Sequence, residues 1–163
     1  MSTTPPRNSV IEGARHIVAT YLQALPIFAT GQVIEHMSAN TEAKLAEALG
    51  KFSLVVIVGI VSALEANSQS QTIFWEKVEI FVHVVENSLN ILIEQAAGDS
   101  TPLPGAWAYA EEIISAIKLA TLSDNLFPQL AEEPVQELPA ADENSIIVAI
   151  KLRLRCDGNS TTN

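Results

Sequence analysis

The chain has 163 residues, of which 48% are hydrophobic, and nine basic residues stand against nineteen acidic ones for a net charge of -10. This length predicts one domain with its own core, while no apolar run approaches the roughly 18 residues of a membrane-spanning helix, so we expect a soluble protein without a membrane partner. The acidic balance argues against nucleic acid as a direct, sequence-specific ligand, because phosphate binding needs positive charge. The single cysteine, Cys156, excludes an internal disulfide and is typical of a reducing compartment.

The first predicted element is a helix that follows a short tail. Residues 1–7 contain two prolines, no apolar anchor and no secretory signal, which predicts a disordered N-terminal tail. From Asn8 apolar residues recur every three or four positions until Pro26 stops the helix. The stripe that we expect to lie on a sheet consists of Val10, Ala14, Ile17, Val18, Tyr21, Leu22 and Leu25.

Two short elements are predicted next. Residues 32–37 form an extended candidate, and residues 41–49 form a second, smaller helix. Asn40 or Thr41 can cap the start of that helix, and Gly50 can end it.

Two strands form the centre of the predicted sheet. Residues 52–61 are almost wholly apolar, as in an interior strand covered on both sides, and residues 75–86 alternate. The polar segment between them predicts a long hairpin connection over residues 62–72. In the second strand the core side holds Val78, Ile80, Val82 and Val84, and the other side holds Lys77, Glu79, Phe81 and His83. This mixed side must meet water, a covering segment or another subunit.

The C-terminal half predicts a helix and two more strands. Residues 87–97 fit a helix or an extended segment equally well, residues 99–105 form a loop, and residues 123–133 have no clear periodicity. The helix between these segments buries one side and exposes Glu111, Glu112 and Lys118 on the other. Its expected buried residues are Trp107, Ala110, Ile113, Ile114, Ile117 and Thr121.

The last two predicted strands are residues 134–138 and 145–156, joined by a turn, and residues 157–163 form a polar tail. In the last strand Lys151, Arg153 and Arg155 share one face, and the other face is formed by Ile146, Val148, Ile150, Leu152, Leu154 and Cys156. The sequence thus predicts a single α+β domain over residues 8–156. We expect a mixed, mainly antiparallel sheet with two main helices packed on one face.

No enzyme signature is found in the sequence. His16, His36 and His83 are far apart, no metal-binding spacing occurs, and no nucleophile elbow or phosphate-binding glycine loop is present. We therefore expect no catalytic, cofactor-binding or metal-binding residues. For His83, a structural place on a sheet face is the favoured interpretation, and the paired carboxylates such as Glu111-Glu112 are interpreted as a solvated surface.

The alternating cations of the last strand allow two interpretations. Lys151, Arg153 and Arg155 form a local positive stripe in an acidic protein. They are the charged side of an exposed or edge strand defended against aggregation, or a docking surface for acidic groups of a neighbouring subunit or partner. The sequence supports the two interpretations about equally.

The order of several stretches carries a resemblance to a known family. These are the helix end at residues 21–29, the short helix 41–49 before residues 54–58, the strand end Val85-Glu86-Asn87, and residues 108–114. With the closing strand at residues 146–156, the sequence resembles small tail proteins of tailed bacteriophages and prophages, in particular tail terminator, or tail completion, proteins. The resemblance spans about residues 18–156.

This resemblance implies a structural virion protein and not an enzyme. Such a subunit forms a homo-oligomer, commonly a hexameric ring, on the last ring of the tail tube protein, stops tube growth and meets the head-tail connector protein. It implies a tail-terminator-like fold, a place in the phage tail, and assembly in the cytoplasm of the bacterial host. Alternatives are another head-tail joining or minor tail protein, and a cellular adaptor that binds an acidic partner. The expected partner interface consists of Lys151, Arg153, Arg155, Glu79, Phe81 and His83.

Overall fold

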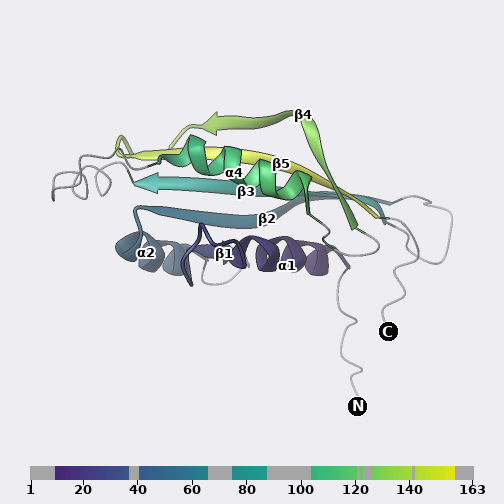
Figure 1. Cartoon of the computed structure of the whole chain (residues 1–163), viewed down its shortest axis with the longest axis horizontal. Helices are drawn as coiled ribbons and strands as arrows, with labels where there is room; N and C mark the ends of the chain where they lie inside the picture. Colours follow the sequence, from purple (N-terminus) through teal and green to yellow (C-terminus); the bar gives the residue numbers. More distant parts are fainter. Residues whose placement is uncertain are drawn as a thin grey trace, which may run out of the picture.

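The computed structural model describes residues 10–36, 41–65, 75–87, 104–120, 122, 126–140 and 142–156. Its helices are α1 (Val10–Gln23), α2 (Thr41–Lys51) and α4 (Ala106–Lys118). Its strands are β1 (Val33–Glu35), β2 (Leu54–Glu65), β3 (Trp75–Asn87), β4 (Leu126–Leu138) and β5 (Ser145–Cys156) (Figure 1). The predicted α+β class is confirmed.

The strands form one mixed sheet in the order β1-β2-β3-β5-β4. Among the described strands, only β1 and β2 pair in parallel, and the other three pairs are antiparallel. Figure 1 shows β2, β3 and β5 side by side along the long axis of the molecule, with α4 crossing β3 and β5. The predicted central position of the strand at residues 75–86 is confirmed, since β3 has neighbours on both sides.

The main core lies on one face of the sheet, which we call the core face. All four residues predicted for the core side of β3 are fully buried, and they pack with buried residues of α1 and α4. Both main helices therefore cover the same face, as predicted. Burying one such aliphatic side chain stabilises the fold by about 1.5–3 kcal/mol. The buried residues contributed by the two helices are Ala14, Val18, Ala19, Leu22, Ala106, Ala110, Ile113 and Ile117.

Polar and aromatic contacts fix α1 against α4. The Tyr21 hydroxyl donates to the carbonyl of Ala116 at 2.9 Å, and the ring of Phe28 stacks on that of Tyr109 with centroids 5.8 Å apart. The turn that follows α1 includes Gly31, whose φ of 87° is a conformation that favours glycine. None of the helices in the described ranges has both the length and the hydropathy needed to cross a membrane.

Helix α2 covers the opposite face of the sheet, but only over β1 and β2. Ala48 of α2, Ile34 of β1 and Val55 of β2 form a small second core. The prediction that Gly50 ends this helix is wrong, because the helix continues to Lys51. Lys51 forms an ion pair with Glu47 one turn earlier, at 2.6 Å, which extends the last turn past the glycine.

The N-terminus of α4 is capped from the sheet. The N-cap residue Gly105 has no side chain, and the carboxylate of Glu86, near the end of β3, accepts a hydrogen bond from the Ala106 amide at 2.6 Å. A Cβ at position 105 would lie 2.9 Å from that carboxylate oxygen, so a glycine allows this approach. The carboxylate accepts a hydrogen bond from an amide that has no partner within the helix. Its negative charge also interacts favourably with the positive end of the helix dipole.

The prediction that Trp107 belongs to the buried side of α4 is wrong. Its side chain is 45% exposed, and Ala106 is buried instead. The buried stripe follows positions 106, 110, 113 and 117, which places Trp107 on the flank of the helix that faces β4. There the indole Nε1 donates to the carboxylate of Glu137 at 3.1 Å.

Two strands are longer than predicted. Strand β4 begins at Leu126 and not at Pro134. The alternation in the sequence does not show this start, because the pairing of β4 with β5 shifts register between Leu130 and Val135. Strand β2 continues to Glu65 through a similar irregularity after Ile60, so residues 62–65 are strand and not connection. The strand at residues 145–156 is confirmed.

Several predictions lie outside the described residues. They concern the tails at residues 1–7 and 157–163, the ambiguous segment after Asn87, and the loop before Pro104. The domain bounds 8–156 therefore stay a prediction.

Candidate functional site

The candidate site lies on the sheet face opposite the core face, beyond the area that α2 covers. We call this area the open face. The antiparallel register of β3 and β5 places Phe81 opposite Lys151, Glu79 opposite Arg153 and His83 opposite Ala149. Because side chains alternate along a strand, these residues project away from the buried core residues beside them.

Aromatic rings form the centre of the open face. The Phe81 ring covers Gly59 of β2, where an added Cβ would overlap the ring. The centroid of the Phe81 ring lies 4.2 Å from that of His83 and 5.9 Å from that of His36. The ring thus contacts two imidazoles, and His83 lies on a sheet face, as predicted.

The charges of the open face are only partly paired. Arg153 Nε donates to the Glu79 carboxylate at 3.0 Å, and the Ser62 hydroxyl donates to the same carboxylate at 3.2 Å. The Lys151 side chain is exposed, and its ammonium has no hydrogen bond or ion pair with the residues that the structure describes. Lys151 is therefore a cation of this face that is available to a partner.

His83 is held in its neutral form by its surroundings. Desolvation by burial lowers the pKa of its imidazole below the ordinary value of 6.5, and the nearby His36 acts in the same direction. A neutral imidazole donates one hydrogen bond and accepts one, so at neutral pH it is a polar group of the face and not a further cation.

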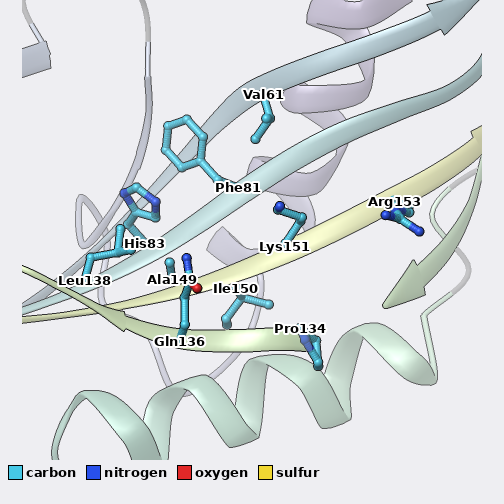
Figure 2. Close-up of a pocket in the computed structure, with 10 residues that line it drawn as sticks. All are labelled: Val61, Phe81, His83, Pro134, Gln136, Leu138, Ala149, Ile150, Lys151 and Arg153. Carbon is cyan, nitrogen blue, oxygen red and sulfur yellow. The ribbon is translucent and has the colours of Figure 1, made fainter. Parts of the chain in front are cut away.

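These side chains surround an open groove of about 520 Å³. Figure 2 shows Phe81 and His83 from β3 and Lys151 and Arg153 from β5 around it, with Gln136 from β4 on the far side. The groove thus combines an aromatic floor with a cationic wall. Among the described residues, its lining consists of Val61, Phe81, His83, Pro134, Gln136, Leu138, Ala149, Ile150, Lys151 and Arg153.

The structure brings most of the predicted interface residues together, but not all of them. Phe81, His83, Lys151 and Arg153 line the groove together, and Glu79 joins them through its bond to Arg153. Arg155 does not line the groove, since it lies farther along β5, opposite Lys77. That these residues bind a partner remains a proposal.

Sequence reasoning missed the part of the groove that β2 and β4 contribute. Gln136, Pro134 and Leu138 share one side of the strand predicted at residues 134–138, so alternation alone groups them. Their position beside β5 gives Gln136 the partner Ala149. Alternation does not predict that Val61 lines the groove, because this residue lies at the irregularity in β2, between the paired residues Ile60 and Ser62.

Within the described part of the chain, no group of three or more His, Cys, Asp or Glu residues is placed to hold a metal ion. A second hollow of about 360 Å³ lies among α2, β1 and the segment after α1. Its lining includes Lys51 and Glu47, which neutralise each other.

Comparison with known proteins finds matches among solved structures. No family model matches the chain, and no curated protein matches it. Among solved structures, a chain from "Virion of native gene transfer agent (GTA) particle" aligns with 93% of this chain and 100% of that chain, with a TM-score of 0.52. The two chains share a fold. Their sequences are 15% identical, and at this identity the likeness concerns the fold alone.

Proposed function

We propose that the chain is a structural protein of a phage tail or tail-like particle. The observation that carries this proposal is the fold shared, over the full length of the other chain, with a component of a gene transfer agent virion. The order of the elements supports it independently, since the sequence resembles small phage tail proteins. No residue is assigned a catalytic, cofactor-binding or metal-binding role.

Within this class we propose the role of tail terminator. In this role copies of the chain form a ring, hexameric as is common in the family it resembles, on the last ring of tail tube protein. The ring stops tube growth and offers a surface to the head-tail connector. Mature protein would then be found in the virion, after assembly in the bacterial cytoplasm.

The open face supports a role in assembly. The described residues leave this sheet face incompletely covered, since Val61 and Lys151 are exposed beside the aromatic centre of the groove. Ring-closing contacts join two different surfaces of identical subunits, and segregated charges suit them. We assign the partner interface to Lys151, Arg153, Arg155, Glu79, Phe81 and His83.

Deletion of the gene in a particle-producing strain tests the terminator role. Electron microscopy should then show tails of uncontrolled length that lack heads, and expression of the intact chain from a plasmid should restore joined particles of uniform length. Headless tails of normal length would favour another head-tail joining protein. Normal joined particles would contradict the proposal.

A second measurement separates the virion protein from a cellular adaptor. Light scattering of the purified chain should detect a ring-sized species, either alone or after purified tail tube protein is added. A chain that stays monomeric and does not bind tube protein would favour an adaptor for an acidic partner.

A further inference from the structure

The edges of the sheet are poorly suited to a partner strand. At one edge the carbonyl of Val33 in β1 already accepts a hydrogen bond from Gln23 Nε2 at 3.3 Å. At the other edge β4 contains Pro128 and Pro134, which lack the amide hydrogen that strand addition uses. A partner is therefore expected to meet a face of the sheet and not an edge.

The groove on the open face fits an apolar surface that carries carboxylates. Val61 at its rim is 49% exposed, and the Phe81 ring forms its floor. Lys151 has no partner among the described residues, and the Arg153 side chain is 39% exposed although it pairs with Glu79. Carboxylates placed here would form charge-assisted hydrogen bonds with both cations.

Such a surface exists on the other side of the same molecule. Glu111, Glu112 and Lys118 are exposed on α4, on the side of the helix that points away from the core, so this side carries a net negative charge. Trp107 is 45% exposed one turn before Glu111, and Leu119 at the end of the helix is 88% exposed. The outer side of α4 thus offers carboxylates beside large apolar side chains, the complement of the groove.

We propose that the groove of one copy receives the outer side of α4 from a second copy, so that copies join front to back. This inference rests on the self-assembly that the proposed function requires. Because α4 packs on the core face, the two surfaces lie on opposite sides of the sheet, and the contact is heterologous. Repeated contacts of this kind give a closed ring or an open filament.

The same charges disfavour a symmetric dimer. Two copies joined groove to groove would bring Lys151 and Arg153 of one copy toward those of the other. Two copies joined through α4 would bring together two sides of net negative charge, since Glu111 and Glu112 outnumber Lys118. Like charges repel in both arrangements, whereas the front-to-back contact pairs opposite charges.

A charge exchange in the full-length chain tests the contact. The front variant carries Lys151→Glu and Gln136→Glu, both at exposed groove positions, and the back variant carries Glu111→Lys and Glu112→Lys. Each variant alone should self-associate at least about tenfold more weakly than the native chain, because its contact pairs like charges. A 1:1 mixture should assemble again, since both contacts in an alternating array then pair opposite charges.

Control variants make the same kind of charge change elsewhere. Lys44→Glu on α2 and Glu143→Lys in the turn before β5 change exposed residues outside both surfaces, and they should associate as the native chain does. Sedimentation velocity measures association, and circular dichroism confirms folding. If the front variant is unfolded, Lys151→Ala replaces it, with a weaker loss expected in the same direction.

The outcomes separate this inference from the proposed function. Front and back variants that assemble like the native chain, or a mixture that does not recover, would overturn the front-to-back contact while self-assembly stands. A native chain that binds tail tube protein without self-association would also overturn it and leave the virion role intact. A native chain that does neither would overturn both.

Discussion

At the scale of single residues, the lowered pKa of His83 makes the stability of the folded chain depend on pH. Because the folded chain holds a proton on His83 less tightly than the unfolded chain, the unfolded state binds more protons as the pH falls below about 6.5. The free energy of unfolding should therefore decrease from pH 6.5 downward, until the pH is below the folded-state pKa. The window above about pH 5.5 is largely free of carboxylate titration.

Urea unfolding between pH 5.5 and 8 measures this effect. His83→Gln should flatten the curve below pH 6.5, because the glutamine side chain does not titrate. His36 also faces the Phe81 ring, so His36→Gln in the His83→Gln background shows whether a second imidazole contributes. Equal slopes in the native and His83→Gln chains would contradict the assignment.

The Phe81 ring packs directly on Gly59 at the groove. A Cβ at position 59 would overlap the Phe81 ring, whose movement is restricted by its contacts with the rings of His83 and His36. Gly59→Ala should therefore destabilise the chain by about 1–3 kcal/mol. In a Phe81→Ala background the same change should cost at least about 1 kcal/mol less, as a double-mutant cycle in urea would show. Additive effects would mean that the ring shifts at no cost.

At the scale of elements, the carboxylate of Glu86 joins β3 to the start of α4. Glu86→Ala removes the acceptor for the Ala106 amide and should cost about 1–3 kcal/mol of stability. Glu86→Gln keeps an oxygen acceptor and should cost less. Glu112→Gln, an exposed change of equal charge on α4, controls for the loss of negative charge. Chemical denaturation measures all three, and equal stability of the Glu86→Ala and control chains would rule out the cap.

The elements that the sequence predicts best are those with an unbroken pattern. Strands β3 and β5 alternate over their whole length and were predicted almost to their ends. The start of β4 was missed because the register shift before Val135 hides the alternation of residues 126–138. Trp107 was misplaced because helical periodicity gives a broad apolar side, and only the packed structure shows that Glu137 provides a partner for the indole at the flank.

At the scale of the whole molecule, the sequence predicts the faces of each strand but not the neighbours of each strand. Alternation places Phe81 and His83 on one side of β3, and Lys151 and Arg153 on one side of β5. That β5 pairs with β3, so that these residues share one groove, depends on a contact between segments about seventy residues apart. Local periodicity contains no information about such a pairing.

The overall charge of -10 opposes the assembly that the local charges favour. Copies of an acidic chain repel one another over long distances at low salt, and a Debye length of about 10 Å at 0.1 M screens most of this repulsion. The front-to-back contact acts at short range and should weaken only as the Debye length shrinks to about 3 Å near 1 M salt. Association of the native chain should therefore rise and then fall as salt increases.

Sedimentation velocity from about 0.01 to 1 M sodium chloride measures this profile, a range over which the Debye length falls from about 30 to 3 Å. The front variant with Lys151→Glu and Gln136→Glu lacks the local attraction, so any association that it retains should only rise with salt. A native profile that falls from the lowest salt upward would mean that the net charge does not oppose assembly. A native profile that only rises would mean that attraction between Lys151 and the carboxylates of α4 contributes little to the contact.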